Sequence, residues 1–297
     1  MLVVSPRFFL EWFIKDFFKI VIVSILFAVI SVFIALSIPN QYSSHVVVSS
    51  NMSDSKSMGG LSKLGGLASL AGISLGGGGS LSPEVLYEML NSGSFLSSFI
   101  RKYDLEKEIM AAESYSPESS RFIYKEKIYD VKNDVWVRDF KFPQTLEPND
   151  SELVEKFKQS FNASYARKTK LIKISFKSFS PQYSVKTLND LIYHFNEYMR
   201  NNDTQESELS IKYLKQELTS SNYQEVNLAL QQLVEEQYKK LAIAKTRDEY
   251  ALRVIEAPLL AANKSEPKRA IICVVITLFG TIFTVFFWWV IRIIRLS

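Results

Sequence analysis

The chain has 297 residues, enough for one or two domains with a sizeable core. Its hydrophobic content of 47% gives a mean hydropathy of +0.03, and the apolar excess lies at the two ends. A net charge of +4, with acidic and basic residues well mixed, does not indicate a nucleic-acid-binding protein. A single cysteine, Cys273, excludes a disulfide framework within one chain.

Two uncharged apolar stretches predict membrane-spanning helices. The first covers residues 20–38 and the second covers 271–291, and a helix needs about 20 apolar residues to cross a bilayer. Trp288 and Trp289 near the end of the second stretch are typical of a membrane interface. A cleaved signal peptide is the alternative for the first stretch, but its apolar run exceeds the roughly 7–15 residues of such peptides.

Positive charges flank both stretches on one side: Arg7, Lys15 and Lys19 before the first, Arg292 and Arg295 after the second. The positive-inside rule then predicts that both termini are cytoplasmic and that the bulk of the chain is periplasmic. Lys268 and Arg269 oppose the rule, but long loops translocate largely regardless of charge. The predicted domains are a cytoplasmic N-terminus at 1–19, a transmembrane helix at 20–38, a periplasmic domain at 39–269, a second transmembrane helix at 270–291 and a cytoplasmic tail at 292–297. We expect no cytoplasmic catalytic or signalling domain.

Short elements follow the first span. A β-branched run within residues 41–50 predicts a strand. The Gly-rich segment 59–80 has apolar residues spaced by three, and it is either a flexible loop or a segment that packs on the membrane or on a neighbouring subunit. Ser82 and Pro83 start a helix that runs through Leu90, and a second helix begins near Ser94. Further predictions are a strand at 135–140, a helix at 151–162 and a strand at 171–177.

Long helices dominate the region from 182 to about 250, because residues 182–257 contain no glycine or proline. The three-four spacing of Val185, Leu188, Ile192, Phe195 and Met199 predicts a coiled-coil seam. With a break at 220–222, two helices of about 35 residues would each reach about 50 Å. Residues 253–255 are expected to return as a strand beside the first one, so that the two ends of the domain pair in a base.

Catalytic and metal-binding patterns are not found in the sequence. The two histidines, His45 and His194, have no Cys, Asp or Glu at a distinctive ligand spacing. No nucleophile elbow, phosphate-binding loop or paired-cysteine motif is present. The basic and aromatic residues 121–125 are interpreted as an ordinary amphipathic surface, with contact to an anionic sugar as the alternative. We predict a protein that is not an enzyme and that binds no cofactor or metal.

Four segments carry a resemblance to a known family. Residues 38–42 read IPNQY, residues 65–78 read GGLASLAGISLGGG, residues 235–258 contain EEQYKKLA and RDEYALRVIEAP, and residues 265–270 read SEPKRA. These segments resemble the chain-length determinant (Wzz) family of polysaccharide co-polymerases, of the lipopolysaccharide/O-antigen type. The resemblance places Pro39, Asn40 and Tyr42, and Pro267, Lys268 and Arg269, in motifs at the membrane boundary. Gly280 is the only glycine of the second span, so a Gly-x-x-x-Gly contact is not predicted.

The resemblance implies a membrane-anchored α+β fold, with two transmembrane helices flanking a periplasmic α/β base from which a long helical hairpin projects. It implies a homo-oligomeric ring that sets glycan length together with an O-antigen polymerase, undecaprenyl-linked glycan and membrane lipid, without nucleic acid. Arg247, Asp248 and Glu249 are candidates for contacts between subunits. The main alternative is an inner-membrane periplasmic adaptor of a capsule or exopolysaccharide export pathway. A two-span sensor and an envelope enzyme are weaker alternatives.

Overall fold

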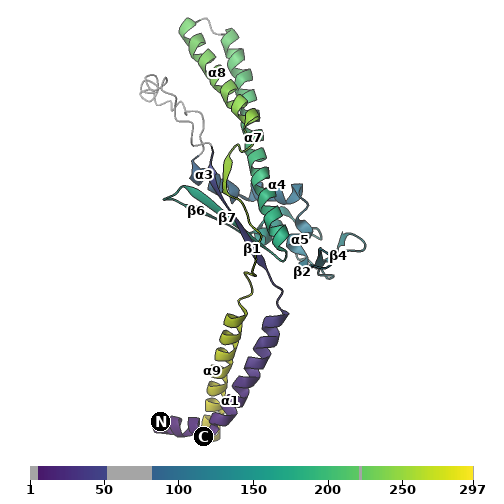
Figure 1. The fold of residues 1–297 in the computed structure, drawn as a ribbon, viewed down its shortest axis with the longest axis vertical. Helices are drawn as coiled ribbons and strands as arrows, with labels where there is room; N and C mark the ends of the chain where they lie inside the picture. The colour runs from purple at the N-terminus through teal and green to yellow at the C-terminus, as the bar shows by residue number, and fades with distance from the viewer. Residues whose placement is uncertain (1–5, 52–81, 221–222, 297) are drawn as a thin grey trace. The chain divides into compact units, whose positions relative to one another are not determined.

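The computed structural model describes residues 6–51, 82–220 and 223–296 of the chain. These residues form two compact units (Figure 1), one made of Met1–Tyr42 and Asn263–Ser297 and the other of Ser43–Ala262. The Gly-rich segment 59–80 lies outside the described residues, so both interpretations of it stay open.

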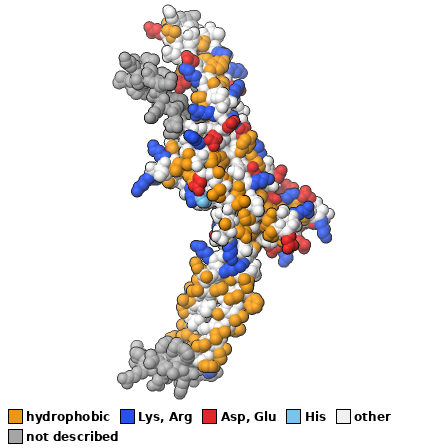
Figure 2. Space-filling view, viewed as in Figure 1, with side chains coloured by type: hydrophobic (Ala, Val, Ile, Leu, Met, Phe, Trp, Pro, Cys, Tyr) orange, Lys and Arg blue, Asp and Glu red, His pale blue; other side chains and the backbone are white. Residues whose placement is uncertain are grey.

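The first unit is a pair of apolar helices, α1 (Pro6–Ser37) and α9 (Arg269–Leu296). Within the described residues, Phe18–Ser37 and Arg269–Ile291 are long and apolar enough to cross a membrane. Only 17% and 11% of these windows are buried in the protein, and apolar side chains cover the outside of both helices (Figure 2). A helix pair with an apolar exterior suits lipid better than the core of a soluble domain.

Small and hydroxyl-bearing residues line the contact between α1 and α9. The Thr281 hydroxyl lies 3.0 Å from the Ser24 hydroxyl, while Ser31 and Thr284 are buried in the same pair of helices. Gly280 faces Phe27 so closely that a Cβ atom built on Gly280 would lie 2.5 Å from the Phe27 ring. Close approach at small residues is how membrane helices gain packing energy, so the single glycine of the second span makes a contact that the sequence pattern did not predict.

Replacing Gly280 with leucine should force the two helices apart, because the added side chain would occupy the space of the Phe27 ring. Overpacking of this kind costs about 1–3 kcal/mol. We expect lower disulfide yield between cysteines placed at positions 24 and 281 in a Cys273→Ala background. Phe279→Leu, at a neighbouring exposed position, is the matched control, and an equal loss of yield in both variants would contradict the packing role.

The second unit is built on a four-stranded sheet of β1 (Tyr42–Ser50), β6 (Phe161–Ala166), β7 (Leu171–Ser178) and β8 (Leu252–Glu256) in the order β6-β7-β1-β8. β1 pairs antiparallel with β8, with Val48 opposite Val254. The strand predicted from residues 253–255 therefore does return beside the first strand. Alternate residues of β7, including Ile172, Ile174 and Phe176, are buried while Lys173 is exposed, so one face of this strand packs on the core.

Four short helices contribute to the core: α3 (Pro83–Leu90), α4 (Gly93–Lys102), α5 (Glu106–Met110) and α6 (Asp150–Lys158). The Ser82, Ser92 and Asn149 side chains cap three of them by accepting a hydrogen bond from the third residue on. Phe95, Phe99, Phe157 and Phe195 are fully buried between these helices and α7 (Pro181–Ser220). The predicted helix starts near residues 82 and 94 are confirmed.

Two predicted elements are wrong in extent. The strand expected at 135–140 is only β5 (Val135–Trp136), paired with β4 (Tyr129–Asp130), because the chain then turns into a loop that Arg138 closes. The helix expected at 151–162 ends at Lys158, and Phe161 is buried in strand β6 instead. A further hairpin, β2 (Ala112–Ser116) with β3 (Arg121–Tyr124), was not predicted and contains residues 121–124 of the amphipathic surface.

The long helices are unequal in length. α7 has 40 residues and runs through Asn201 and Asn202 without a break, whereas α8 (Gln224–Thr246) has 23. The prediction of two helices of about 35 residues each was therefore wrong. Leu188, Ile192, Phe195 and Met199 pack into the domain core rather than forming a coiled-coil seam, and only the later part of α7 pairs with α8 as a hairpin (Figure 1).

His194 is an uncharged member of this core. Its ring lies among Phe95, Phe99 and Tyr103, with Nε2 at 3.1 Å from the Ser98 hydroxyl. The Ser98 hydroxyl donates to the Phe95 carbonyl, so it accepts from Nε2–H, and the Nδ1 atom has no partner among the described residues. Burial, followed by the charge of Lys102, lowers the pKa of His194 to about 4.

A pKa below the unfolded value of about 6.5 means that the unfolded chain binds the proton more tightly. The His194 contribution to stability is present above pH 6.5 and decreases as the pH falls towards 4. We expect His194 to lower the free energy of unfolding by about 1–2 kcal/mol between pH 7 and pH 5. Thermal unfolding of wild type and His194→Gln at both pH values measures this, because the variant lacks the titrating ring; identical pH dependence would contradict it.

Candidate functional site

The motifs at residues 38–42 and 265–270 meet in the first unit. The Gln41 amide donates to the Glu266 carbonyl at 2.9 Å, and the Ser265 amide donates to the Gln41 carbonyl at 2.8 Å. The Ser265 hydroxyl donates to the same carbonyl at 3.0 Å. We name residues 38–42 with 265–269 the boundary junction. It joins the end of α1 to the start of α9 by backbone pairing.

Arg269 is the principal side chain of the boundary junction. Its guanidinium donates to the Ala35 carbonyl at 3.0 Å and to Oδ1 of Asn40 at 3.1 Å. The last carbonyls of a helix have no partner within it, and a cation at that end is favourable. Arg269 begins α9, where its charge would oppose the dipole of its own helix, but its side chain reaches across to cap α1 instead.

The other predicted residues of the junction are placed around this contact. Pro39 and Lys268 are exposed, Pro267 is half-buried, and Tyr42 is half-buried at the start of β1. Of the six predicted residues, Asn40 and Arg269 are thus brought into direct hydrogen-bonding contact.

Residues Arg247, Asp248 and Glu249 lie in the connection between α8 and β8. The guanidinium of Arg200 on α7 donates to the carbonyls of Arg247 and Asp248 at 2.6 and 2.9 Å. A Glu249 carboxylate oxygen accepts from the Val254 amide at 3.0 Å. The side chains of Arg247 and Asp248 are exposed, so their assignment to subunit contacts stays a prediction.

A buried polar clamp fixes where α8 ends and β8 begins. The Asn196 amide oxygen accepts from the backbone amides of Ala251 and Leu252, each at 2.8 Å, and the Tyr250 hydroxyl donates to Asp203 at 2.7 Å. Lys240 of α8 lies 3.0 Å from the same Asp203 carboxylate. Burial, followed by the Asp203 acceptor, raises the pKa of Tyr250. Sequence reasoning missed this clamp, although Asn196 within an otherwise apolar stripe was a possible signal.

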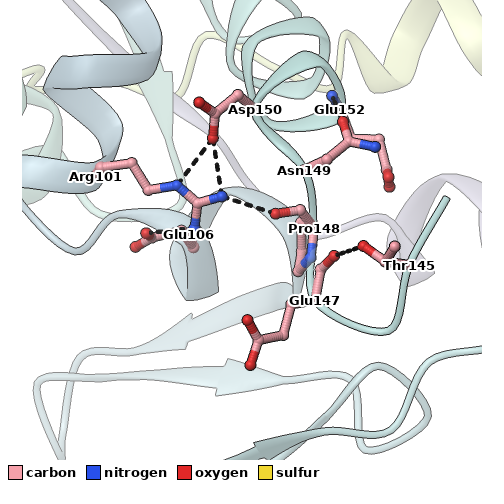
Figure 3. Close-up of polar contacts among 8 residues, drawn as sticks. All are labelled: Arg101, Glu106, Thr145, Glu147, Pro148, Asn149, Asp150 and Glu152. Atoms are coloured by element: carbon pink, nitrogen blue, oxygen red, sulfur yellow. Dashed lines mark hydrogen bonds and ion pairs between the residues drawn. The ribbon is translucent and has the colours of Figure 1, made fainter.

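A second arginine anchors the segment before α6 (Figure 3). The Arg101 guanidinium donates to Asp150 at 2.9 and 3.0 Å, to Glu106 at 3.1 Å and to the Pro148 carbonyl at 2.9 Å. A hydrogen bond from Ser97, followed by Arg101, lowers the pKa of Asp150. These four hydrogen bonds tie α4 to the segment that leads into α6.

The helical hairpin of α7 and α8 has large apolar side chains that are exposed on its surface. Leu209 and Tyr213 on α7 are 55% and 66% exposed, and Leu228 on α8 is 55% exposed. Leu209 and Tyr213 are four residues apart and therefore share one helix face. α7 and α8 pack against each other, and Ile211 and Leu241 are buried in this hairpin. The face of α7 that carries Leu209 and Tyr213 is therefore a candidate surface for contact with another copy of the chain.

No group of three or more His, Cys, Asp or Glu side chains in the described parts of the chain is placed to hold a metal ion. The sequence matches no protein-family model and no curated protein. Among solved structures, the chain is similar to a full-length bacterial polysaccharide co-polymerase, with a TM-score of 0.38 and 10% identity over 95% of this chain and 97% of that one. It is also similar to a fragment of WzzB, a polysaccharide co-polymerase from Salmonella Typhimurium, with a TM-score of 0.34 and 10% identity over 76% of this chain and 100% of the fragment.

Arg269→Ala should weaken the boundary junction, because the Ala35 carbonyl and Asn40 lose their charged donor. Hydrogen bonds to charged groups contribute about 1.5–3 kcal/mol each, and partial exposure of Arg269 reduces this to about 1–3 kcal/mol in total. Thermal unfolding in detergent measures the loss. Lys268→Ala removes the same charge at the adjacent exposed position and is expected to change stability by less than about 0.5 kcal/mol; similar losses in both variants would contradict the capping role.

Proposed function

We propose that this protein is a membrane-anchored regulator of polysaccharide chain length that acts as a homo-oligomer beside a separate O-antigen polymerase. In this proposal α1 and α9 cross the inner membrane, both termini are cytoplasmic, and the second unit stands in the periplasm. The protein makes no glycosidic bond itself; it organises the polymerase and its undecaprenyl-linked glycan.

The boundary junction is the observation that carries the proposal. Two of the four segments that carry the resemblance to the chain-length determinant family lie far apart in the chain, at 38–42 and 265–270. Asn40 and Arg269 are separated by 229 residues. These two motifs meet through backbone hydrogen bonds and the Arg269–Asn40 contact. A chance likeness of short segments would not require them to meet, so their contact supports a shared architecture at the end of the spans.

The exposed face of the hairpin supports the oligomer. Leu209 and Tyr213 are exposed on one face of α7, and Leu228 is exposed on α8. Large apolar side chains that gather on an exposed surface mark a candidate interaction site. Side-by-side packing of hairpins would bury it without changing the fold of one subunit. Arg247 and Asp248, which are exposed, and Glu249, which is half-buried, complete the set of proposed subunit contacts.

The test is the lipopolysaccharide ladder of cells that lack the gene, resolved on a gel. We expect loss of the modal cluster of chain lengths, restored by wild type and by Lys268→Ala but not by Arg269→Ala. An unchanged ladder, together with unchanged lengths of other surface polysaccharides, would contradict the proposal and favour the export adaptor.

The oligomer is tested separately with Leu209→Asp combined with Tyr213→Asp, which places charge on the outward face. We expect a smaller particle in native mass measurements of the detergent-solubilised protein and a broadened ladder. Asn201→Asp combined with Thr219→Asp puts the same two charges on exposed positions on another side of α7 and should leave both the particle mass and the ladder unchanged. An unchanged particle mass in the double variant would remove this face from the interface.

A further inference from the structure

The β-hairpin of β6 and β7 carries only positive charge. Residues 161–178 contain no aspartate or glutamate and five basic residues: Arg167, Lys168, Lys170, Lys173 and Lys177. The whole chain has 35 basic and 31 acidic residues, so its general composition does not explain this separation. Figure 1 shows β6 and β7 projecting from the sheet, and Figure 2 shows Lys and Arg side chains at that edge of the second unit.

Three of these charges lie in the turn between the two strands. Ala166 and Leu171 are the last paired residues, and the Lys170 amide donates to the Ala166 carbonyl at 2.8 Å. Arg167, Lys168 and Lys170 are all exposed. Lys170 has a φ of 56°, a left-handed conformation in which glycine or asparagine is the usual residue. The turn therefore has a lysine where the backbone alone favours an uncharged residue.

The outward face of the two strands continues this surface. Ile172 and Ile174 of β7 are buried on the inward face, in the hydrophobic core. Side chains alternate along a strand, so Lys173 points outwards, where it is exposed beside Ser164, its partner on β6. Asn162 is exposed on the same face. The face thus combines positive charge with hydroxyl and amide groups that can both donate and accept hydrogen bonds.

One carboxylate lies close to the hairpin, but it belongs to the inward side. Glu84 accepts from the Tyr165 hydroxyl at 2.8 Å, and Tyr165 packs against the hydrophobic core. The charge of Lys170 acts on this Glu84 carboxylate. Within residues 6–51, 82–220 and 223–296, no ion pair is formed by Arg167, Lys168 or Lys173. Their charges are therefore free to attract an anion from outside the chain.

Protection of a sheet edge does not account for these lysines. Lysine on an edge strand prevents that strand from pairing with another chain. β6 is at the edge of the four-stranded sheet, yet its residues Phe161–Ala166 carry no charge. Lys173 is instead on β7, an inner strand that has β6 on one side and β1 on the other.

A second copy of the chain is also a poor partner for this face. The cores of protein interfaces are enriched in aromatic side chains and depleted in lysine and serine. The outward face of the hairpin has no aromatic side chain, and its only large apolar side chain is the half-buried Leu171. The remaining outward residues are Asn162, Ser164, Ala166, Lys173, Ser175 and Lys177. The face therefore suits a hydrated polyanion better than a protein surface.

We infer that the turn and the outward face of the β6–β7 hairpin bind an anionic polysaccharide, whose sugars carry carboxylate or phosphate groups. The inference deepens the proposed function, because it names the chemical class of glycan that this protein meets, and it rests on that function for the choice of a glycan among polyanions. Several like charges on one surface raise the local concentration of a polyanion. Ser164 and Asn162 supply hydrogen-bonding groups for sugar hydroxyls next to Lys173.

The experiment measures binding of polysaccharides to the full chain in phosphatidylcholine nanodiscs. Polygalacturonate supplies carboxylates, phosphomannan supplies phosphates, and dextran is the neutral control. We expect at least one anionic polysaccharide to bind, more weakly as the ionic strength rises, and dextran not to bind. Lys168→Gln combined with Lys173→Gln should weaken binding by at least about tenfold, since one lysine near an anionic surface contributes about fivefold in affinity.

Two control variants separate the site from the general charge of the protein. Lys168→Arg combined with Lys173→Arg keeps the charge and should keep the binding. Lys125→Gln combined with Lys127→Gln removes the same charge from exposed positions at and beside the amphipathic surface 121–125, and it should change the affinity by less than about twofold. An equal loss in this second control would overturn the assignment to the hairpin.

Three further results would overturn the inference. Neither anionic polysaccharide binds; or vesicles of phosphatidylglycerol bind through Lys168 and Lys173 while the polysaccharides do not; or the Lys168→Gln, Lys173→Gln variant has a lower particle mass, which assigns the face to a subunit contact. The lipopolysaccharide ladder is a separate readout. A protein that restores the ladder without binding either polysaccharide refutes the hairpin site alone, whereas binding by a protein whose loss leaves the ladder unchanged refutes the chain-length function and leaves the site intact.

Discussion

The structure depends on one constraint, that the segment after α1 pairs with the segment before α9. β1 has β7 on one side and β8 on the other, so it is an inner strand only because the end of the domain returns to it. The pairing continues outwards at Gln41 and Glu266, where the two segments again exchange backbone hydrogen bonds. All the elements between β1 and β8, including the short helices and the α7–α8 hairpin, lie in the chain that connects these two paired strands. The capping of α1 by Arg269 then follows from the geometry at the end of the paired segments.

α7 combines two environments in one uninterrupted helix. Its first half belongs to the core, where Leu188, Phe195 and their neighbours pack on the sheet, and its second half packs against α8. The change occurs at the polar clamp, where Asn196 and Asp203 satisfy backbone and side-chain groups of the returning chain. Buried polar groups are costly unless they are paired, so these bonds determine the position at which α8 stops and the chain turns into β8.

Sequence reasoning succeeded where a local pattern and its physical cause coincide. The capping residue Ser82 marked the start of α3, and alternation marked β7, because hydrogen bonding and burial act over a few residues there. Sequence reasoning failed where contacts between residues far apart in the chain determine the structure. The stripe from Leu188 to Met199 has coiled-coil spacing, yet it packs on a sheet, since periodicity reports that a face is buried but not against what. The loop that Arg138 closes and the cap that Arg269 makes depend on partners that spacing does not identify.

The ladder between β1 and β8 also has a consequence for the order of assembly. Asn51 and Glu249, which bond at its end, are 198 residues apart, so β1 leaves the ribosome long before its second neighbour has been made. Contacts of such high sequence separation form slowly, and a β-branched strand with an open edge is prone to wrong pairing in the meantime. Synthesis at about 5–20 residues per second leaves that edge uncovered for roughly 10–40 s. A chain truncated before residue 252 would lack β8 and would leave this edge of β1 permanently unpaired.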